Sequence, residues 1–148
     1  IAFVILMVMA IAFGTVGLYF STTVERTVTA SVRAYSLAFA MTVGLWLGLT
    51  IIIRLLTEFF SGANTSILAQ GVLTYLESIA TSLNPIMTAL RTQELLVNQQ
   101  GIFFYEVILR DSSRLPVIAP WLTFTVIYLL LASVMVVLAV RRMRRVEA

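Results

Sequence analysis

Long apolar runs without a charged side chain are the feature that most limits how this chain can fold. Such runs cover residues 1–20, 34–53 and 120–140. At about 1.5 Å of rise per helical residue, each run spans about 30 Å, the thickness of the hydrocarbon core of a bilayer. Hydrophobic residues make up 60% of the chain, against about 45–50% in a soluble domain. The sequence therefore predicts an all-α integral membrane protein with three transmembrane helices, at about 1–20, 34–54 and 120–140.

The first run begins at Ile1, with no Met and no basic leader before it. A secretory signal would carry such a leader and a small-residue cleavage site. We therefore expect residues 1–148 to be a fragment of one transmembrane domain of a longer protein, and the first run to be a membrane span.

Several chemically important residue types are missing from the chain. It contains no Cys, no His and no Lys, so all ten of its cationic side chains are Arg. Zinc, haem and iron–sulfur sites need Cys or His, and the common nucleophile pairs need His or Lys. The single Asp, Asp111, cannot form a two-aspartate protease site. We expect no catalytic residue, no metal and no cofactor in this chain.

Charged residues are distributed unevenly along the sequence. The stretch 21–33 carries a net charge of +1, the tail from Arg141 carries +3, and the long segment 54–115 carries −1. Arg-rich flanks remain on the cytoplasmic side of a membrane. We therefore expect 21–33 and the C-terminus to be cytoplasmic and the acidic segment to be outside. The cations do not form a basic face with interleaved aromatics, so we expect no nucleic-acid partner.

The outer segment is too apolar for a solvated loop. ILAQGVLTYLESIATSL (67–83) places apolar residues on one helical stripe and polar residues on another. Asn84-Pro85 then interrupts the helix, because a residue before Pro disfavours the α region. IMTALRTQELLV (86–97) predicts a second short helix, with Arg91 and Glu94 as a local ion pair. Two short amphipathic helices meeting at a Pro turn indicate an outer re-entrant helical hairpin at about 66–97.

Three residues of the second run are candidates for packing or for lining a pathway. Gly44 and Gly48 form a G-x-x-x-G pattern, which lets another helix approach closely but also occurs by chance in apolar helices. Trp46 lies near mid-span, although Trp prefers the membrane interface. It is a candidate for lining a translocation cavity, and ordinary packing is the competing interpretation.

Glu77 is the acidic residue that the hairpin would bring closest to membrane depth. An ionisable group at that depth indicates a functional role, because ionisation in hydrocarbon costs on the order of 3 kcal/mol. If the hairpin lies shallow, Glu77 is simply solvated.

The order of these segments resembles the C-terminal half of the membrane subunit of type-2 ABC transporters, the exporter-type permeases. GTVGLYFSTTVERTVTASV (14–32) is similar to the small-residue-rich fourth helix of that family and the short cytoplasmic loop after it. SLNPIMTAL (82–90) resembles the Asn-Pro segment of the re-entrant stretch between its fifth and sixth helices. LPVIAPWLTFTVIYLLLASVMVVLAVRRMRR (115–145) resembles its last helix and basic tail. The resemblance covers nearly the whole chain.

The resemblance implies an ATP-driven exporter of the cell (inner) membrane. ATP hydrolysis would belong to a partner ABC ATPase subunit or domain, which Thr22, Glu25 and Arg26 are candidates to contact. A second permease copy would complete a pathway for an exported substrate that the sequence does not identify. The hairpin would close the outer gate, which makes Asn84 and Pro85 gate candidates.

Two other interpretations remain open from the sequence. A piece of a secondary transporter would bind a coupling ion through charged groups inside its spans, and the predicted spans contain none before Arg54. A membrane anchor or assembly subunit is compatible with every feature of the chain. Co-purification with an ATPase would separate the exporter from both.

Overall fold

Helices account for most of the chain in the computed structural model, which describes residues 1–24, 26–60, 67–98, 101–109 and 112–146 and all their side chains except those of 60, 145 and 146. Among these residues, three helical stretches are long and apolar enough to cross a membrane: Ala2–Thr23, Thr27–Phe59 and Pro120–Arg144. The prediction of three such helices is confirmed. Contacts divide the chain into two compact units, residues 1–41 with 125–148 and residues 42–124.

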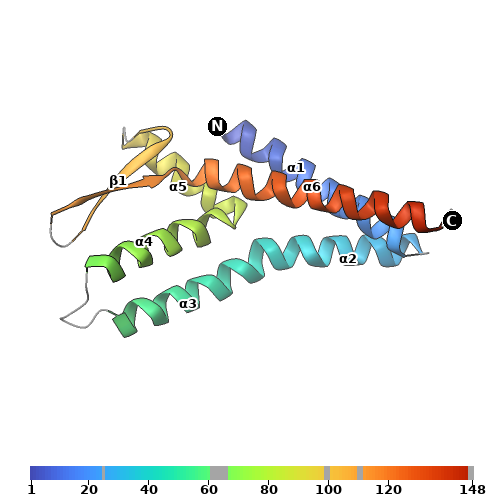
Figure 1. Ribbon diagram of the computed structural model, residues 1–148, viewed down its shortest axis with the longest axis horizontal. Coiled ribbons are helices and arrows are strands. Elements are labelled where there is room, and N and C mark those ends of the chain that lie inside the picture. Colours follow the sequence, from blue (N-terminus) through green and yellow to red (C-terminus); the bar gives the residue numbers. More distant parts are fainter. Residues whose placement is uncertain (25, 61–66, 99–100, 110–111, 147–148) are drawn as a thin grey trace. The chain divides into compact units, whose positions relative to one another are not determined.

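The first unit contains α1 (Ala2–Thr23), α2 (Thr27–Phe39) and the later part of α6 (Pro120–Val146). α1 packs along α2 (Figure 1). The ring of Phe13 on α1 meets the ring of Tyr128 on α6 edge to face, with the ring centroids 6.2 Å apart. The buried residues of α1 repeat every three or four positions and therefore form one face: Ile5, Val8, Ala12 and Val16.

The polar stretch expected as a loop at 21–33 is mostly helical, so that boundary was wrong. α1 continues to Thr23, and α2 already begins at Thr27. The hydroxyls of Thr22 and Thr23 each donate to the carbonyl of Tyr19, at 2.8 Å. Because these hydroxyls are paired within the helix, polar residues there do not end it.

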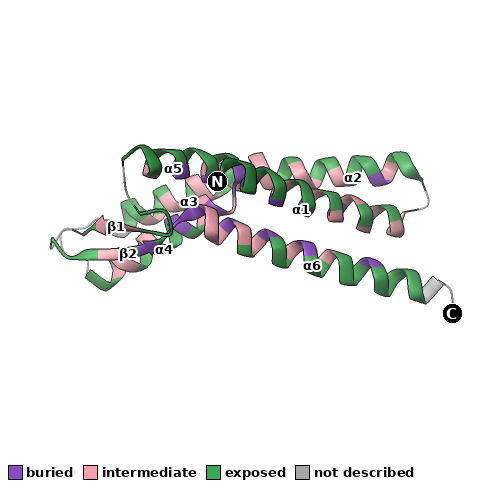
Figure 2. Ribbon diagram, turned by 90° about the horizontal axis from the view of Figure 1, so that it is seen from above, coloured by how far each residue is buried: buried purple, intermediate pink, exposed green. Residues whose placement is uncertain are grey.

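Helical residues run without interruption from Thr27 to Phe60. The stretch begins as α2, widens into the π-helical turn η1 (Ala40–Gly44) and continues as α3 (Leu45–Phe60). Single π turns inside α-helices occur frequently at functional sites. Figure 2 shows that intermediate and exposed residues dominate this stretch, as expected for a helix whose surface faces lipid or a partner.

The second unit contains α3, α4 (Ile67–Ser82), α5 (Pro85–Val97) and a strand pair. α4 packs beside α3 and α5, and it also contacts β2 (Figure 1). The two predicted short helices on either side of Asn84-Pro85 are therefore confirmed.

An antiparallel pair of strands, β1 (Phe104–Ile108) and β2 (Arg114–Ile118), contradicts the all-α expectation for this part of the chain. The register pairs Phe104 with Ile118 and Ile108 with Arg114. Pro116 lies inside β2, where its missing N–H is tolerated because β2 is an edge strand. A charged residue and a proline within such short segments hid the strand pattern.

Candidate functional site

Polar residues are buried where α4 meets α5, and apolar residues are exposed on the same helices. Among the described residues from Ile67 to Asn98, the buried ones are Ser78, Ser82, Asn84, Pro85, Thr88 and Thr92. The exposed large apolar residues are Ile67, Leu68, Val72, Tyr75, Leu76, Ile79, Ile86, Leu90, Leu96 and Val97. This is the reverse of the polarity of a soluble hairpin, in which apolar residues fill the core.

Asn84 joins the turn of this hairpin to the π turn of η1. Its side-chain oxygen accepts hydrogen bonds from the backbone N–H groups of Ile86, at 2.9 Å, and Met87, at 3.1 Å. It is therefore the N-cap of α5, and Pro85 occupies the first helical position, where a missing N–H costs nothing. The side-chain amide of Asn84 donates to the backbone carbonyl of Thr42. One buried side chain thus starts α5 and holds the turn against η1.

Hydrogen bonds satisfy most of the buried hydroxyls of the hairpin. Ser82 donates to the carbonyl of Ser78 at 2.7 Å, and Thr88 donates to the carbonyl of Thr81 across the turn at 3.3 Å. The hydroxyl of Tyr105 on β1 lies 3.5 Å from that of Ser78. The polar interior is therefore a paired network, as burial of hydroxyls requires.

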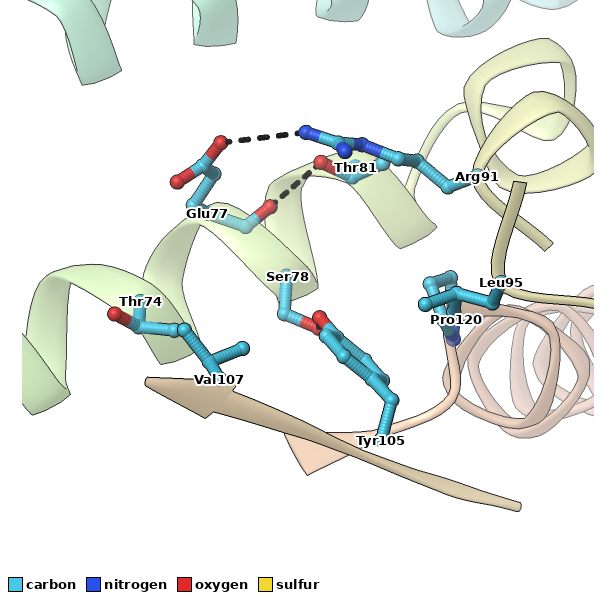
Figure 3. A pocket seen from close by; sticks show the side chains of 9 residues that line it. All are labelled: Thr74, Glu77, Ser78, Thr81, Arg91, Leu95, Tyr105, Val107 and Pro120. Carbon is cyan, nitrogen blue, oxygen red and sulfur yellow. Dashed lines mark hydrogen bonds and ion pairs between the residues drawn. The ribbon is translucent and has the colours of Figure 1, made fainter. Parts of the chain in front are cut away.

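A cavity of about 260 Å³ lies between α4, α5, β1 and the start of α6. Figure 3 shows the side chains that line it. Hydroxyls of α4 and β1 make up much of its polar wall, Glu77 and Arg91 supply its charges, and three apolar residues complete it. The lining residues are Thr74, Glu77, Ser78, Thr81, Arg91, Leu95, Tyr105, Val107 and Pro120.

Arg91 lies between two carboxylates at the edge of this cavity. Its guanidinium is 3.1 Å from Glu94 and 3.9 Å from Glu77. The predicted Arg91–Glu94 pair is confirmed, and Glu77 joins the same cluster. All three side chains are more than half exposed, so each pair contributes only a few tenths of a kcal/mol in water. The contact of Arg91 with Glu77 is longer than its contact with Glu94, so Glu77 is held less tightly than Glu94.

A second cavity, of about 130 Å³, separates α3 from the hairpin. Trp46 and Asn84 both line it, so the structure brings together two of the predicted pathway residues. Thr81 and Arg91 line both cavities. The two cavities therefore share one wall, with Glu77 on one side of it and Trp46 on the other.

The remaining predicted residues lie elsewhere in the chain. Thr22 is in the last turn of α1, Arg26 is the N-cap of α2, and Glu25 lies outside the described residues. Gly44 ends η1. A methyl group added at Gly48 would meet no atom of a neighbouring described element within 4 Å, so the G-x-x-x-G contact, between subunits or within one, stays a prediction.

The sequence analysis missed three parts of this site. Thr42 contributes through its backbone carbonyl, which leaves no signature in the sequence. Tyr105 belongs to the strand pair that was not predicted. The buried hydroxyls were partly detectable, because Ser78 and Ser82 are four residues apart and so share one helix face.

Thr92 gives a direct test of this packing. Its hydroxyl is buried on α5 and has no hydrogen-bond partner among the described residues. Replacing Thr92 with Val removes an unpaired polar group while preserving the shape of the side chain. We expect T92V to raise the free energy of unfolding by about 1 kcal/mol, measured by denaturant titration in micelles. A loss of similar size would mean that the hydroxyl is paired.

Comparison with models of protein families, with curated proteins and with solved structures found no match to this chain. A functional assignment must therefore come from the residues and their geometry.

Proposed function

We propose that α4 and α5 form a re-entrant hairpin that enters the bilayer from the outer side and returns to it. The observation that carries this proposal is the reversed polarity of the hairpin. Exposed Leu76 and Ile79 would cost free energy in water but are stable in hydrocarbon. Buried Ser82 and Thr88 keep their hydrogen bonds away from lipid.

The contact between Asn84 and Thr42 supports a deep position for the turn. Thr42 lies near the middle of the candidate span Thr27–Phe59. At about 1.5 Å per residue, the helix between Thr42 and Arg54 is about 18 Å long, slightly more than half of a hydrocarbon core of about 30 Å. If Arg54 lies at the outer interface, the turn at Asn84 reaches the centre of the bilayer. Buried Asn84 shields its own polar groups by pairing them.

On this basis we propose that the chain is the membrane-spanning part of an ATP-driven ABC exporter and forms half of a dimeric pathway. The two cavities share a wall at Thr81 and Arg91. With the hairpin in the outer half of the bilayer, this wall would lie between the outside and the membrane interior, which supports a role as a gate. The resemblance to the permease family supports the same function. ATP hydrolysis is assigned to a partner ATPase subunit or domain, because this chain has no Lys for a phosphate-binding loop.

The orientation follows from charge and is part of the same proposal. The Arg-rich tail and the loop between α1 and α2 lie in the cytoplasm, and the hairpin lies on the outer side of the cell (inner) membrane. The loop then faces the ATPase, which gives Arg26 a role as a contact residue.

The test is ATP turnover by the intact protein, purified from detergent with any ATPase that accompanies it and reconstituted in liposomes. We expect an ATPase to co-purify or to be fused, and R26A to lower turnover about fivefold or more, the lower end of typical coupling energies. Arg33, an exposed residue of α2, provides the matched control R33A, which should change turnover little.

Absence of any nucleotide-hydrolysing partner would contradict the exporter proposal. Transport that continues without ATP but follows an ion gradient would point instead to a secondary transporter. A protein that shows neither activity would be an anchor or assembly subunit.

A further inference from the structure

Large apolar side chains are exposed at one end of the strand pair. Phe104 on β1 and Ile118 on β2 are directly paired, so their side chains lie on the same face of the sheet. They are 60% and 47% exposed. Ile102 and Phe103, which precede β1, are exposed as well. We call these four residues the strand patch.

The opposite end of the strand pair is charged. Arg114 and Glu106 form an ion pair of 3.1 Å, and both side chains are more than half exposed. Glu106 lies two positions from Phe104, and Ile108, the partner of Arg114, lies four positions from it, which at about 3.3 Å per residue are about 7 Å and about 13 Å. The strand pair therefore gains charged side chains over about 7–13 Å, enough to cross the headgroup region, which is about 5–8 Å thick on each side of the bilayer.

The strand patch is fixed to the start of α6. The backbone N–H of Ala119 donates to the carbonyl of Phe103 at 2.8 Å. The indole N–H of Trp121 donates to the carbonyl of Ile102 at 2.8 Å, and its ring lies 5.9 Å from the ring of Phe103. The patch thus cannot move away from the first turn of the helix that Pro120 begins.

We propose that the strand patch binds the headgroup–acyl boundary of the outer leaflet, so that the strand pair lies on the bilayer as an interfacial anchor. The patch faces the membrane because it lies directly beside Pro120, which starts the candidate span Pro120–Arg144. If this span crosses the bilayer, the residues beside Pro120 lie at the membrane surface. Aromatic rings concentrate at that level. Arg114, at the other end, and Glu106, in the middle of β1, reach the headgroups or water. This inference depends on α6 crossing the membrane, not on transport.

The experiment uses single-Cys variants of the intact protein. Residues 1–148 contain no Cys, and any Cys elsewhere in the intact protein is first replaced with Ser. An environment-sensitive fluorophore is attached at residue 104, 118 or 114 in phosphatidylcholine vesicles. We expect blue-shifted emission at 104 and 118, with strong quenching by lipids brominated near the ester end of the acyl chain. The label at 114 should emit as in water and be quenched by iodide instead.

A second pair of variants measures the contribution to stability. F104D should lower the midpoint of thermal unfolding in vesicles, because it places a charge at the apolar boundary. I108D is the matched control: it lies on the same strand and the same face and is 73% exposed, yet it is beside Arg114 at the charged end. It should leave the midpoint unchanged.

Two results would overturn the inference. Iodide quenching at 104 and 118 equal to that at 114 would place the patch in water. Labels at 104 and 118 that neither iodide nor brominated lipid reaches would mean that a second copy or another protein covers the patch. Neither result depends on whether an ATPase accompanies the protein, so failure here is distinguishable from failure of the proposed function.

Discussion

Replacing Asn84 with Ala should lower the free energy of unfolding by about 1.5–3 kcal/mol. The substitution removes the N-cap of α5, worth about 0.5–2 kcal/mol, and the hydrogen bond to the Thr42 carbonyl, worth about 1 kcal/mol. The Asn84 side chain is buried, so water does not replace its lost hydrogen bonds freely. The change can be measured by SDS titration of the protein in mixed micelles.

A matched variant separates the two functions of this side chain. Ser caps helices about as well as Asn but is too short to reach Thr42 as well. N84S should therefore retain the cap and lose only about 1 kcal/mol, the value of the bridge. If N84A and N84S are both as stable as the original protein, the bridge between η1 and the hairpin does not exist.

A charge near the turn of the hairpin should be far more damaging than the same charge at its outer end. Ile79 lies on the exposed stripe of α4, close to the turn, and is 45% exposed. If this stripe faces lipid, I79R should cost about 2–3 kcal/mol, as Arg does at the centre of a bilayer. The cost can be read from SDS titration or from the fraction of protein that inserts correctly.

Leu68 provides the control for this prediction. It is on the same stripe at the start of α4 and is 82% exposed, so it is the more accessible position of the two. It precedes Ile79 by eleven residues, or about 17 Å of helix, which places it at the interface. L68R should therefore cost less than about 1 kcal/mol. Small and equal effects at both positions would mean that the stripe faces water.

The membrane helices could be predicted from the sequence because length and absence of charge decide them. Each run is uncharged over about 20 residues, and nothing in tertiary structure overrides that. The two short helices on either side of Pro85 were predictable for a similar reason, since a proline marks the boundary. The boundary between α1 and α2 was not predictable. The hydroxyls of Thr22 and Thr23 donate to the carbonyl of Tyr19, so these polar residues remain helical.

The details of the candidate site could not be predicted, because they depend on contacts between residues that are far apart in the sequence. Nothing in AMTVG (40–44) marks a π turn, and the bond from Asn84 to Thr42 joins residues 42 positions apart. The strand pair was hidden by Pro116 and by an irregular alternation of polar and apolar residues. Trp46 and Glu77 were identifiable as unusual residues for their positions, but their neighbours were not.

The depth of residue 86 in the bilayer decides whether α4 and α5 form a re-entrant hairpin. Ile86 follows the turn and is exposed, so a nitroxide on I86C would not be shielded by the described chain. In liposomes, a re-entrant hairpin predicts that oxygen, which concentrates in hydrocarbon, relaxes the nitroxide much more than a water-soluble nickel chelate does. The same label at Gln93, nearer the outer end of α5, should show a smaller ratio. Relaxation at residue 86 dominated by the nickel chelate would place the turn in water and contradict the account.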